Sequence, residues 1–184
     1  RELNGIPCFE LQETRPYKKS IMTSRSFKHE LDSFKALHEV LSNFACSCAL
    51  KLRKQNTRAK KLILFIQTNR FRSDVKSHYG SLEIEFPIAT NDSIEIVKAT
   101  YMALDKLYDK SCAYKRAGVI LSDIIPDQQV QLNLFGKYDV EKRTKLMKVY
   151  DDVNRKMGEG TLRLSIQGVE NKWGEKQAPI SFGH

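Results

Sequence analysis

Apolar residues recur with two different periods along residues 18–121, and each period predicts one type of secondary structure. Residues 18–27 are β-compatible and follow Pro16, which favours an extended lead-in, so they predict a first strand. Apolar side chains then recur every three or four residues, which predicts a long helix beginning near Asp32 or Ser33. The apolar face of this helix consists of Phe34, Leu37, Leu41, Phe44, Cys48 and Leu52.

Four further elements follow the first helix. Residues 62–66 form a continuous apolar run that predicts a central strand. Within residues 82–88, the apolar side chains of Leu82, Ile84, Phe86 and Ile88 alternate with Glu83 and Glu85, which predicts a half-buried strand. Asp92 with Glu95 three residues later is typical of a helix start. Residues 114–121 predict the fourth strand. The apolar stripe of the second helix is Ile94, Val97, Tyr101, Leu104 and Tyr108.

The order β-α-β-β-α-β predicts an α+β fold in which two helices cover one face of a four-stranded sheet and leave the other face open. Alternation on the fourth strand assigns one set of residues to the core and another to the open face. The set assigned to the core is Ala117, Val119 and Leu121. The set assigned to the open face is Tyr114, Arg116 and Gly118. On the first strand the alternation identifies neither set as buried. Its sets are Ser20, Met22, Ser24 and Ser26, and Ile21, Thr23, Arg25 and Phe27.

The chain changes character after the fourth strand. A polar stretch that begins at Ser122 and contains Pro126 predicts a linker. Within it stand Gln131, Leu132, Asn133, Leu134 and Phe135, which form either a fifth strand or an extended peptide that inserts apolar side chains into a partner. A helix ended by Gly158 and Gly160 follows, and then a short strand. The helix is marked by Val140, Met147, Tyr150, Val153 and Met157, and the strand by Leu162, Leu164 and Ile166.

Composition and charge narrow the class of protein. With 184 residues, 41% of them hydrophobic and 29% charged, the chain suits one soluble globular domain with a tail. It starts at Arg1 without a secretory signal pattern, so we expect a piece of a longer cytoplasmic protein. The net charge is +9, and residues 1–80 hold 16 Lys and Arg against 7 Asp and Glu. A basic excess concentrated in one half of the chain favours a polyanionic partner.

The remaining candidate side chains predict neither a metal site nor an active site in this chain. The cysteines lack the spacing of a zinc site, so we expect reduced, structural thiols at Cys8, Cys46, Cys48 and Cys112. The histidines are scattered at His29, His38, His78 and His184. Asp151 and Asp152 are neighbours on a helix and diverge, so we expect two surface charges.

Several motifs together resemble the C-terminal part of UmuC-type, Y-family translesion DNA polymerases. Leu3, Asn4, Gly5 and Cys8 resemble the end of the thumb, and residues 21–27, with Ser24, Arg25, Ser26 and Phe27, resemble the first strand of the little finger domain. Residues 114–119 resemble its last strand, and residues 131–135 are similar to the clamp-binding motif of bacterial polymerases. Gly160, Thr161, Leu162, Gln167 and Gly168 resemble the additional UmuC-type C-terminal segment.

The resemblance implies a division of the chain and a set of contacts. It implies the end of the thumb in residues 1–16, a DNA-binding little finger domain in 17–125, a linker with the clamp motif in 126–138 and a UmuC-type segment in 139–184. The implied DNA contacts are Ser24, Arg25, Ser26, Thr68, Asn69, Arg70, Lys115 and Arg116. From residue type alone, Thr68, Asn69 and Arg70 equally suit an ordinary turn, and Lys115 and Arg116 suit solvated charges.

The resemblance also implies the role of the parent protein. It implies a polymerase of the SOS response to DNA damage whose catalytic palm, with its magnesium ions, lies elsewhere, so this part should not polymerise and should need no cofactor. The implied partners are primer-template DNA, the sliding clamp, processed UmuD and the RecA filament. An RNA-recognition module has the same element order, and residues 78–80 faintly resemble its signature. Glu83 and Glu85, however, occupy positions where that module needs stacking aromatics.

Overall fold

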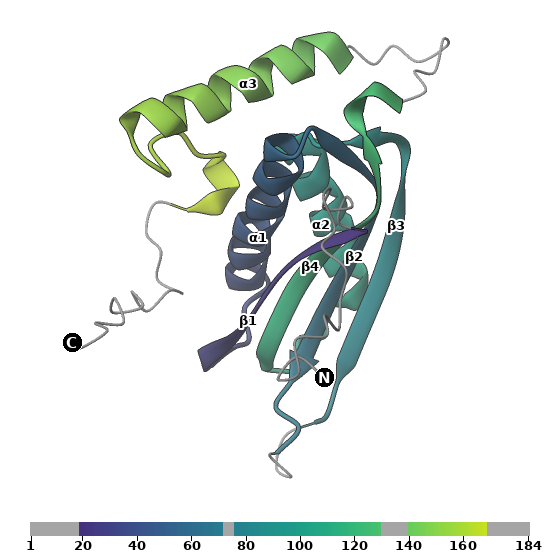
Figure 1. Cartoon of the computed structure of the whole chain (residues 1–184). Coiled ribbons are helices and arrows are strands. Elements are labelled where there is room, and N and C mark those ends of the chain that lie inside the picture. Colours follow the sequence, from purple (N-terminus) through teal and green to yellow (C-terminus); the bar gives the residue numbers. More distant parts are fainter. Residues whose placement is uncertain (1–18, 72–75, 130–139, 169–184) are drawn as a thin grey trace, which may run out of the picture.

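The computed structural model describes residues 19–71, 76–129 and 140–168 (Figure 1). Its elements follow the predicted order β-α-β-β-α-β, with a third helix after the fourth strand. They are β1 (Ser20–Leu31), α1 (Phe34–Lys54), β2 (Thr57–Thr68), β3 (Tyr79–Thr90), α2 (Ser93–Leu107), β4 (Tyr114–Pro126), the 3₁₀ turn η2 (Asp127–Gln129), α3 (Val140–Met157) and the 3₁₀ turn η3 (Ser165–Gln167).

The four strands form one sheet in the order β1-β4-β2-β3, and each pair of neighbours is antiparallel. Helices α1 and α2 lie side by side on one face of this sheet, as Figure 1 shows. The core lies between these two layers, where Leu62 of β2 pairs with Leu121 of β4 on one side and with Ile84 of β3 on the other. The predicted α+β fold is therefore confirmed.

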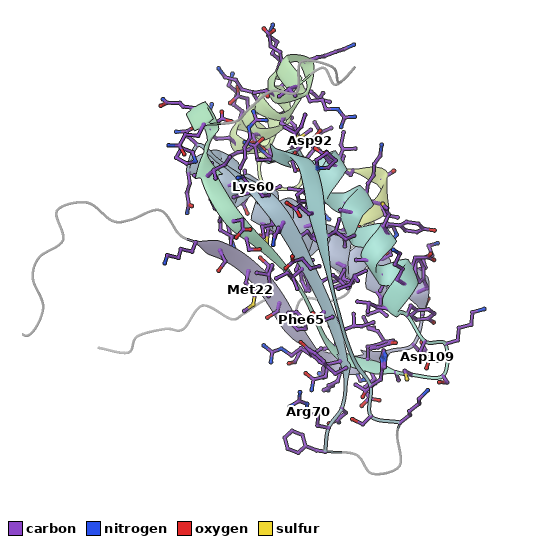
Figure 2. All side chains as sticks on the ribbon, turned by 90° about the vertical axis from the view of Figure 1, so that its right-hand side faces the viewer. Met22, Lys60, Phe65, Arg70, Asp92 and Asp109 are labelled. Carbon is purple, nitrogen blue, oxygen red and sulfur yellow. The ribbon has the colours of Figure 1, made fainter. Side chains whose placement is uncertain are left out.

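Strand pairing decides the two faces of β1, which alternation alone left open. Ile21, Thr23 and Arg25 pair with Leu121, Val119 and Ala117, all of which are buried beneath the helices. These β1 residues therefore have the parity of the core-facing side. The other set has the parity of the open face, where Met22 is labelled in Figure 2. Its members are Ser20, Met22, Ser24 and Ser26.

Helix α1 confirms the periodicity predicted for it. Ser33 is the N-cap residue, and Leu37, Leu41 and Leu52 are fully buried against the sheet and α2. The last turn carries Lys51, Arg53 and Lys54, cations that favour the negative end of the helix dipole.

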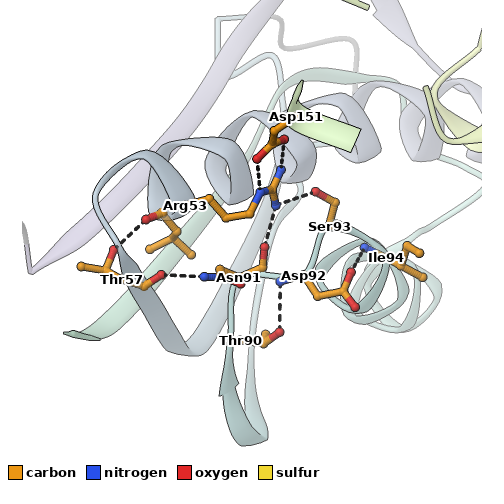
Figure 3. Close-up of polar contacts among 9 residues, drawn as sticks. Arg53, Thr57, Thr90, Asn91, Asp92, Ser93, Ile94 and Asp151 are labelled. Atoms are coloured by element: carbon orange, nitrogen blue, oxygen red, sulfur yellow. Dashed lines mark hydrogen bonds and ion pairs between the residues drawn. The ribbon is translucent and has the colours of Figure 1, made fainter. Parts of the chain in front are cut away.

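Helix α2 begins as predicted, but its predicted stripe is partly wrong. The carboxylate of Asp92 accepts a hydrogen bond of 2.8 Å from the backbone N–H of Ile94, which confirms the N-cap (Figure 3). The side of the helix that packs on the sheet and α1 includes Ile96, Thr100 and Ala103, which are fully buried and were not in the predicted stripe. Tyr101 therefore lies at the outer border and is 45% exposed.

Two features of β4 correct the sequence predictions. Tyr114 is fully buried rather than on the open face, because β4 has one extra residue between the partners of Gln67 and Thr68 and the alternation breaks there. The strand also continues through Ser122 to Pro126, since its end pairs with the start of β2. The predicted start of the linker at Ser122 is therefore wrong.

Residues 140–168 contact the domain at three places: η3 packs against α1, Asp151 of α3 pairs with Arg53 of α1, and Arg143 of α3 pairs with Asp92. Helix α3 ends as predicted at Gly158 and Gly160, whose φ angles of 108° and 83° favour glycine. The short strand predicted after it is wrong, because Ser165–Gln167 forms a 3₁₀ turn. Two hydrogen bonds of the Gln167 side chain stabilise that turn. Gln167 donates one of 3.1 Å to Asn43 of α1 and accepts one of 2.8 Å from the Leu164 N–H.

The packing of α3 also separates its two neighbouring aspartates. Asp152 pairs with Arg155 one turn away and keeps a side chain that is 39% exposed, which agrees with the predicted surface charge. Asp151 faces α1 instead, where it pairs with Arg53, and its side chain is only 24% exposed. The prediction of a surface charge is therefore wrong for Asp151, because α3 lies on the domain.

The thiols in the described part of the chain are free and buried, at Cys46, Cys48 and Cys112. Cys8 and the residues of the predicted thumb end lie outside the described residues. Among the helices that the model describes, none is long and apolar enough to cross a membrane.

Candidate nucleic-acid interface

The pairing register places four rows of side chains across the open face of the sheet. Each row takes one residue from each strand, in the order β1, β4, β2, β3. The rows are Ser26, Arg116, Gln67 and Tyr79; Ser24, Gly118, Phe65 and Ser81; Met22, Ile120, Ile63 and Glu83; and Ser20, Ser122, Lys61 and Glu85.

The β1 and β4 side of this face presents unpaired hydrogen-bond donors. Arg116 is exposed, as predicted, and makes no ion pair with any carboxylate among the described residues. Ser26 stands opposite Arg116 and Ser24 stands opposite Gly118. Neither serine hydroxyl has a hydrogen-bond partner in the described part of the chain. A guanidinium beside two free hydroxyls suits a phosphate oxygen.

The β3 side of the same face is acidic. Glu83 and Glu85 are exposed there, in agreement with the predicted wet parity. Lys61 lies between this edge and β4, with its ammonium 3.0 Å from Glu83 and 3.6 Å from Asp123. Its hydrogen bond to Glu83 raises the pKa of Lys61. Among the rows described above, the cation of the open face without a carboxylate partner is therefore Arg116 of β4, and it stands beside the β1 serines.

Arg25 and Lys115 are placed differently from the two serines and Arg116. Arg25 is exposed at the edge strand, but it has the parity of Thr23, whose hydroxyl accepts hydrogen bonds from Cys48 and Lys51 of α1. It therefore belongs to the helix side of the sheet. Lys115 is half-buried and donates a 3.0 Å hydrogen bond to the backbone carbonyl of Lys28. The structure thus separates these two cations from the open-face donors.

Residues 68–70 form a turn at the end of β2. Thr68 is 2% exposed, and its hydroxyl accepts a 2.8 Å hydrogen bond from the N–H of His78. The Asn69 side chain accepts one of 3.1 Å from the N–H of Phe71. Arg70, the last of these three residues, is exposed and is labelled in Figure 2. Thr68 and Asn69 thus hold the turn, while Arg70 is accessible to a partner.

Sequence reasoning missed Phe65, which stands in the middle of the open face. It lies within the apolar run 62–66, which was expected to be a central strand without a division into faces. The parity of that run contains the missing signal, because Leu62, Leu64 and Ile66 face the core and leave Ile63 and Phe65 on the other side. The clamp-motif residues 131–135 lie outside the described residues. In the described ranges no group of three His, Cys, Asp or Glu side chains could hold a metal ion.

Comparison with known proteins places the chain in a family. Residues 18–134 match the model of the impB/mucB/samB family C-terminal domain, and residues 144–181 match a domain of unknown function, DUF4113. The first match covers more than half of the chain, so the chain belongs to the impB/mucB/samB family and carries its C-terminal domain.

Individual relatives agree with this assignment. The chain is 33% identical over 182 residues to Protein UmuC of Salmonella typhimurium and 32% identical over 183 residues to Protein SamB of the same species. Each match covers 98% of this chain but 43% of the relative, so the chain spans less than half the length of these relatives. The resemblance to UmuC-type proteins is confirmed.

Solved structures with a similar fold are Y-family DNA polymerases. A Dbh-Dpo4-Dbh chimera has a TM-score of 0.45 at 15% identity, over 64% of this chain and 32% of the chimera. A post-insertion binary complex of Dbh DNA polymerase has a TM-score of 0.48 at 17% identity, over 61% and 32%.

Proposed function

We propose that this chain is the DNA-gripping C-terminal part of a UmuC-type translesion DNA polymerase and holds primer-template DNA through its backbone. Membership of the impB/mucB/samB family supports the class of protein. The observation that carries the binding site is the set of Ser24, Ser26 and Arg116, which stand together with unpaired donors on a sheet face that no described helix covers.

These residue types suit binding without a preferred base sequence. Arginine and serine donate hydrogen bonds to phosphate oxygens, and such contacts set the position of a duplex without reading base edges. A polymerase that copies damaged templates needs contacts of this kind, since base identity and shape vary at a lesion. Arg70, exposed at the end of β2, extends the proposed set along the sheet, and Thr68 and Asn69 support its turn.

The RNA-recognition alternative is less well supported by the open face. That class stacks unpaired bases on aromatic side chains at the centre of its sheet. Here Phe65 is 9% exposed, and Glu83 and Glu85 place carboxylates on the neighbouring edge strand. Carboxylates repel a phosphate chain, so we favour duplex held on the β1 and β4 side.

The wider role of the parent protein is part of the same proposal. We propose a cytoplasmic polymerase of the SOS response that is tethered to the sliding clamp by residues 131–135 and works with processed UmuD and the RecA filament. Magnesium would serve the polymerase reaction at residues outside this chain. The resemblance of the chain to UmuC-type polymerases supports these partners as a group.

A titration of labelled primer-template duplex at several salt concentrations tests the DNA site. Each neutralised phosphate contributes about −0.9 to the slope of log affinity against log salt, so Arg116→Ala should flatten the slope by about 1. Arg25→Ala is the matched control, because Arg25 is an exposed arginine on the strand next to Arg116 but on the opposite side of the sheet. Equal slopes for the two variants would contradict an open-face site, as would an affinity independent of salt.

A further inference from the structure

The Phe65 ring packs closely against Gly118 on the open face. A Cβ atom added to Gly118 would stand 2.6 Å from the Cε1 and Cζ atoms of the Phe65 ring and 2.5 Å from the Cβ of Ser24. Such distances leave no room for any side chain at position 118. Because Gly118 has no side chain, the Phe65 ring packs directly against this position of the sheet.

Arg116 places its guanidinium over this ring. Its guanidinium carbon is 5.8 Å from the centre of the Phe65 ring, within the range of a cation–π contact. The two residues come from adjacent strands, β4 and β2, and Phe65 pairs with Gly118, two residues from Arg116. The ring therefore neighbours both Gly118 and the Arg116 guanidinium, and it is only 9% exposed although it stands on the open face.

From this geometry we infer that Phe65 is a positioning residue. It holds the Arg116 guanidinium over the sheet in a conformation ready to donate hydrogen bonds to a phosphate. A guanidinium stacked by one face on an aromatic ring keeps the N–H donors in its plane available. Ser26 faces Arg116 across β1 and β4, so a phosphate in that plane would meet a hydroxyl as well. This inference rests on the proposed DNA-binding function and assigns part of it to a residue that need not touch DNA.

The physical gain is pre-organisation. An exposed arginine that moves freely loses side-chain entropy when it binds, and this loss weakens affinity. The Phe65 ring restricts Arg116 before DNA arrives. The contribution of Arg116 to affinity should therefore depend on an aromatic ring at position 65.

A double-mutant cycle in the full chain tests this dependence with labelled primer-template duplex. Phe65→Leu keeps an apolar side chain over Gly118 but removes the ring, and should weaken binding about two- to fivefold, the size of an exposed cation–π contact. In the Arg116→Ala background the same change should have no effect. Ile63→Leu, on the same face of β2 one row further away, is the control and should behave alike in both backgrounds.

The outcomes separate this inference from the proposed function. If Phe65→Leu weakens binding equally with and without Arg116, DNA binding stands and the positioning role is wrong. NMR of the DNA-free chain supplies an independent readout. The side-chain protons of Arg116 should show a ring-current shift that disappears in Phe65→Leu while the chain remains folded. An Arg116 without that shift would overturn the inference whether or not the chain binds DNA.

Discussion

The guanidinium of Arg53 forms a two-point ion pair with the carboxylate of Asp151, through hydrogen bonds of 2.7 and 2.8 Å (Figure 3). Arg53 lies in the last turn of α1 and Asp151 lies on α3, so the pair joins the sheet domain to the segment that matches DUF4113. The remaining nitrogen of Arg53 donates to the backbone carbonyl of Asn91 and to the Ser93 hydroxyl at the start of α2. One side chain thus connects three elements.

We predict that Asp151→Asn loosens α3 from the domain. The Arg53 side chain is 11% exposed, so removal of its charged partner leaves a mostly buried cation and should lower the free energy of unfolding by about 1–3 kcal/mol. Urea denaturation measures this loss, and trypsin cleavage within α3 should become faster. Asp152→Asn is the matched control, because an exposed pair with Arg155 contributes less than about 0.5 kcal/mol. Equal stability of the two variants would contradict a docking role for Asp151.

We predict that Gly118→Ala destabilises the sheet. The added methyl group would collide with Ser24 and the Phe65 ring, and relief requires that β1 or the ring move. Overpacking of this kind costs about 1–3 kcal/mol, which thermal denaturation detects. Gly80→Ala provides a comparison on the helix side of β3, where the nearest atom is the flexible end of Leu107 at 3.1 Å. A larger loss of stability for Gly80→Ala than for Gly118→Ala would show that Phe65 does not pack tightly against Gly118.

We predict that the chain loses stability as the pH rises above about 9. Burial raises the pKa of Cys46 from 9.0 to about 12, and it also raises the pKa of Cys48. Between these values a thiol stays protonated in the folded chain but ionises on unfolding, so alkali favours the unfolded state. The free energy of unfolding should fall by about 1.4 kcal/mol per pH unit for each such thiol. Urea unfolding from pH 7 to 10.5 measures the slope.

Cys46→Ala provides the control for this pH dependence. Its loss of packing acts at every pH, whereas the loss of one titrating thiol should flatten only the alkaline slope. An alkaline slope that is the same in the variant and the parent would show that Cys46 does not titrate as its burial predicts.

We predict that Leu134→Ala with Phe135→Ala abolishes binding to the sliding clamp. Two apolar side chains in a polar linker bury surface only when a partner covers them, and each contributes about 1.5–3 kcal/mol before ordering costs. A segment of five residues should therefore bind with modest, micromolar affinity, which surface plasmon resonance measures. Melting temperature and DNA affinity should stay unchanged. Unfolding of the double variant would instead identify residues 131–135 as a strand of the core.

The sequence by itself determined the elements and the layer they form. Leu37, Leu41 and Leu52 recur with the helical period, and Leu82 and Phe86 with the strand period, because each element meets the core on one side. The cap at Asp92 and the glycines that end α3 were also predictable, since they depend on backbone groups a few residues away. Such local rules place secondary structure without knowledge of the tertiary partners.

The tertiary structure alone decided which side chains meet. The extra residue in β4 turns Tyr114 into the core, and strand register separates Arg25 from Ser24 and Ser26 and brings Arg116 over Phe65. Arg53 and Asp151 stand 98 residues apart in the chain and meet only because the fold brings α3 to the last turn of α1. Periodicity reports that a position is buried or exposed, but the identity of its neighbour depends on pairing and packing between distant segments. For that reason the candidate site could be named in part from its motifs but assembled only from the fold.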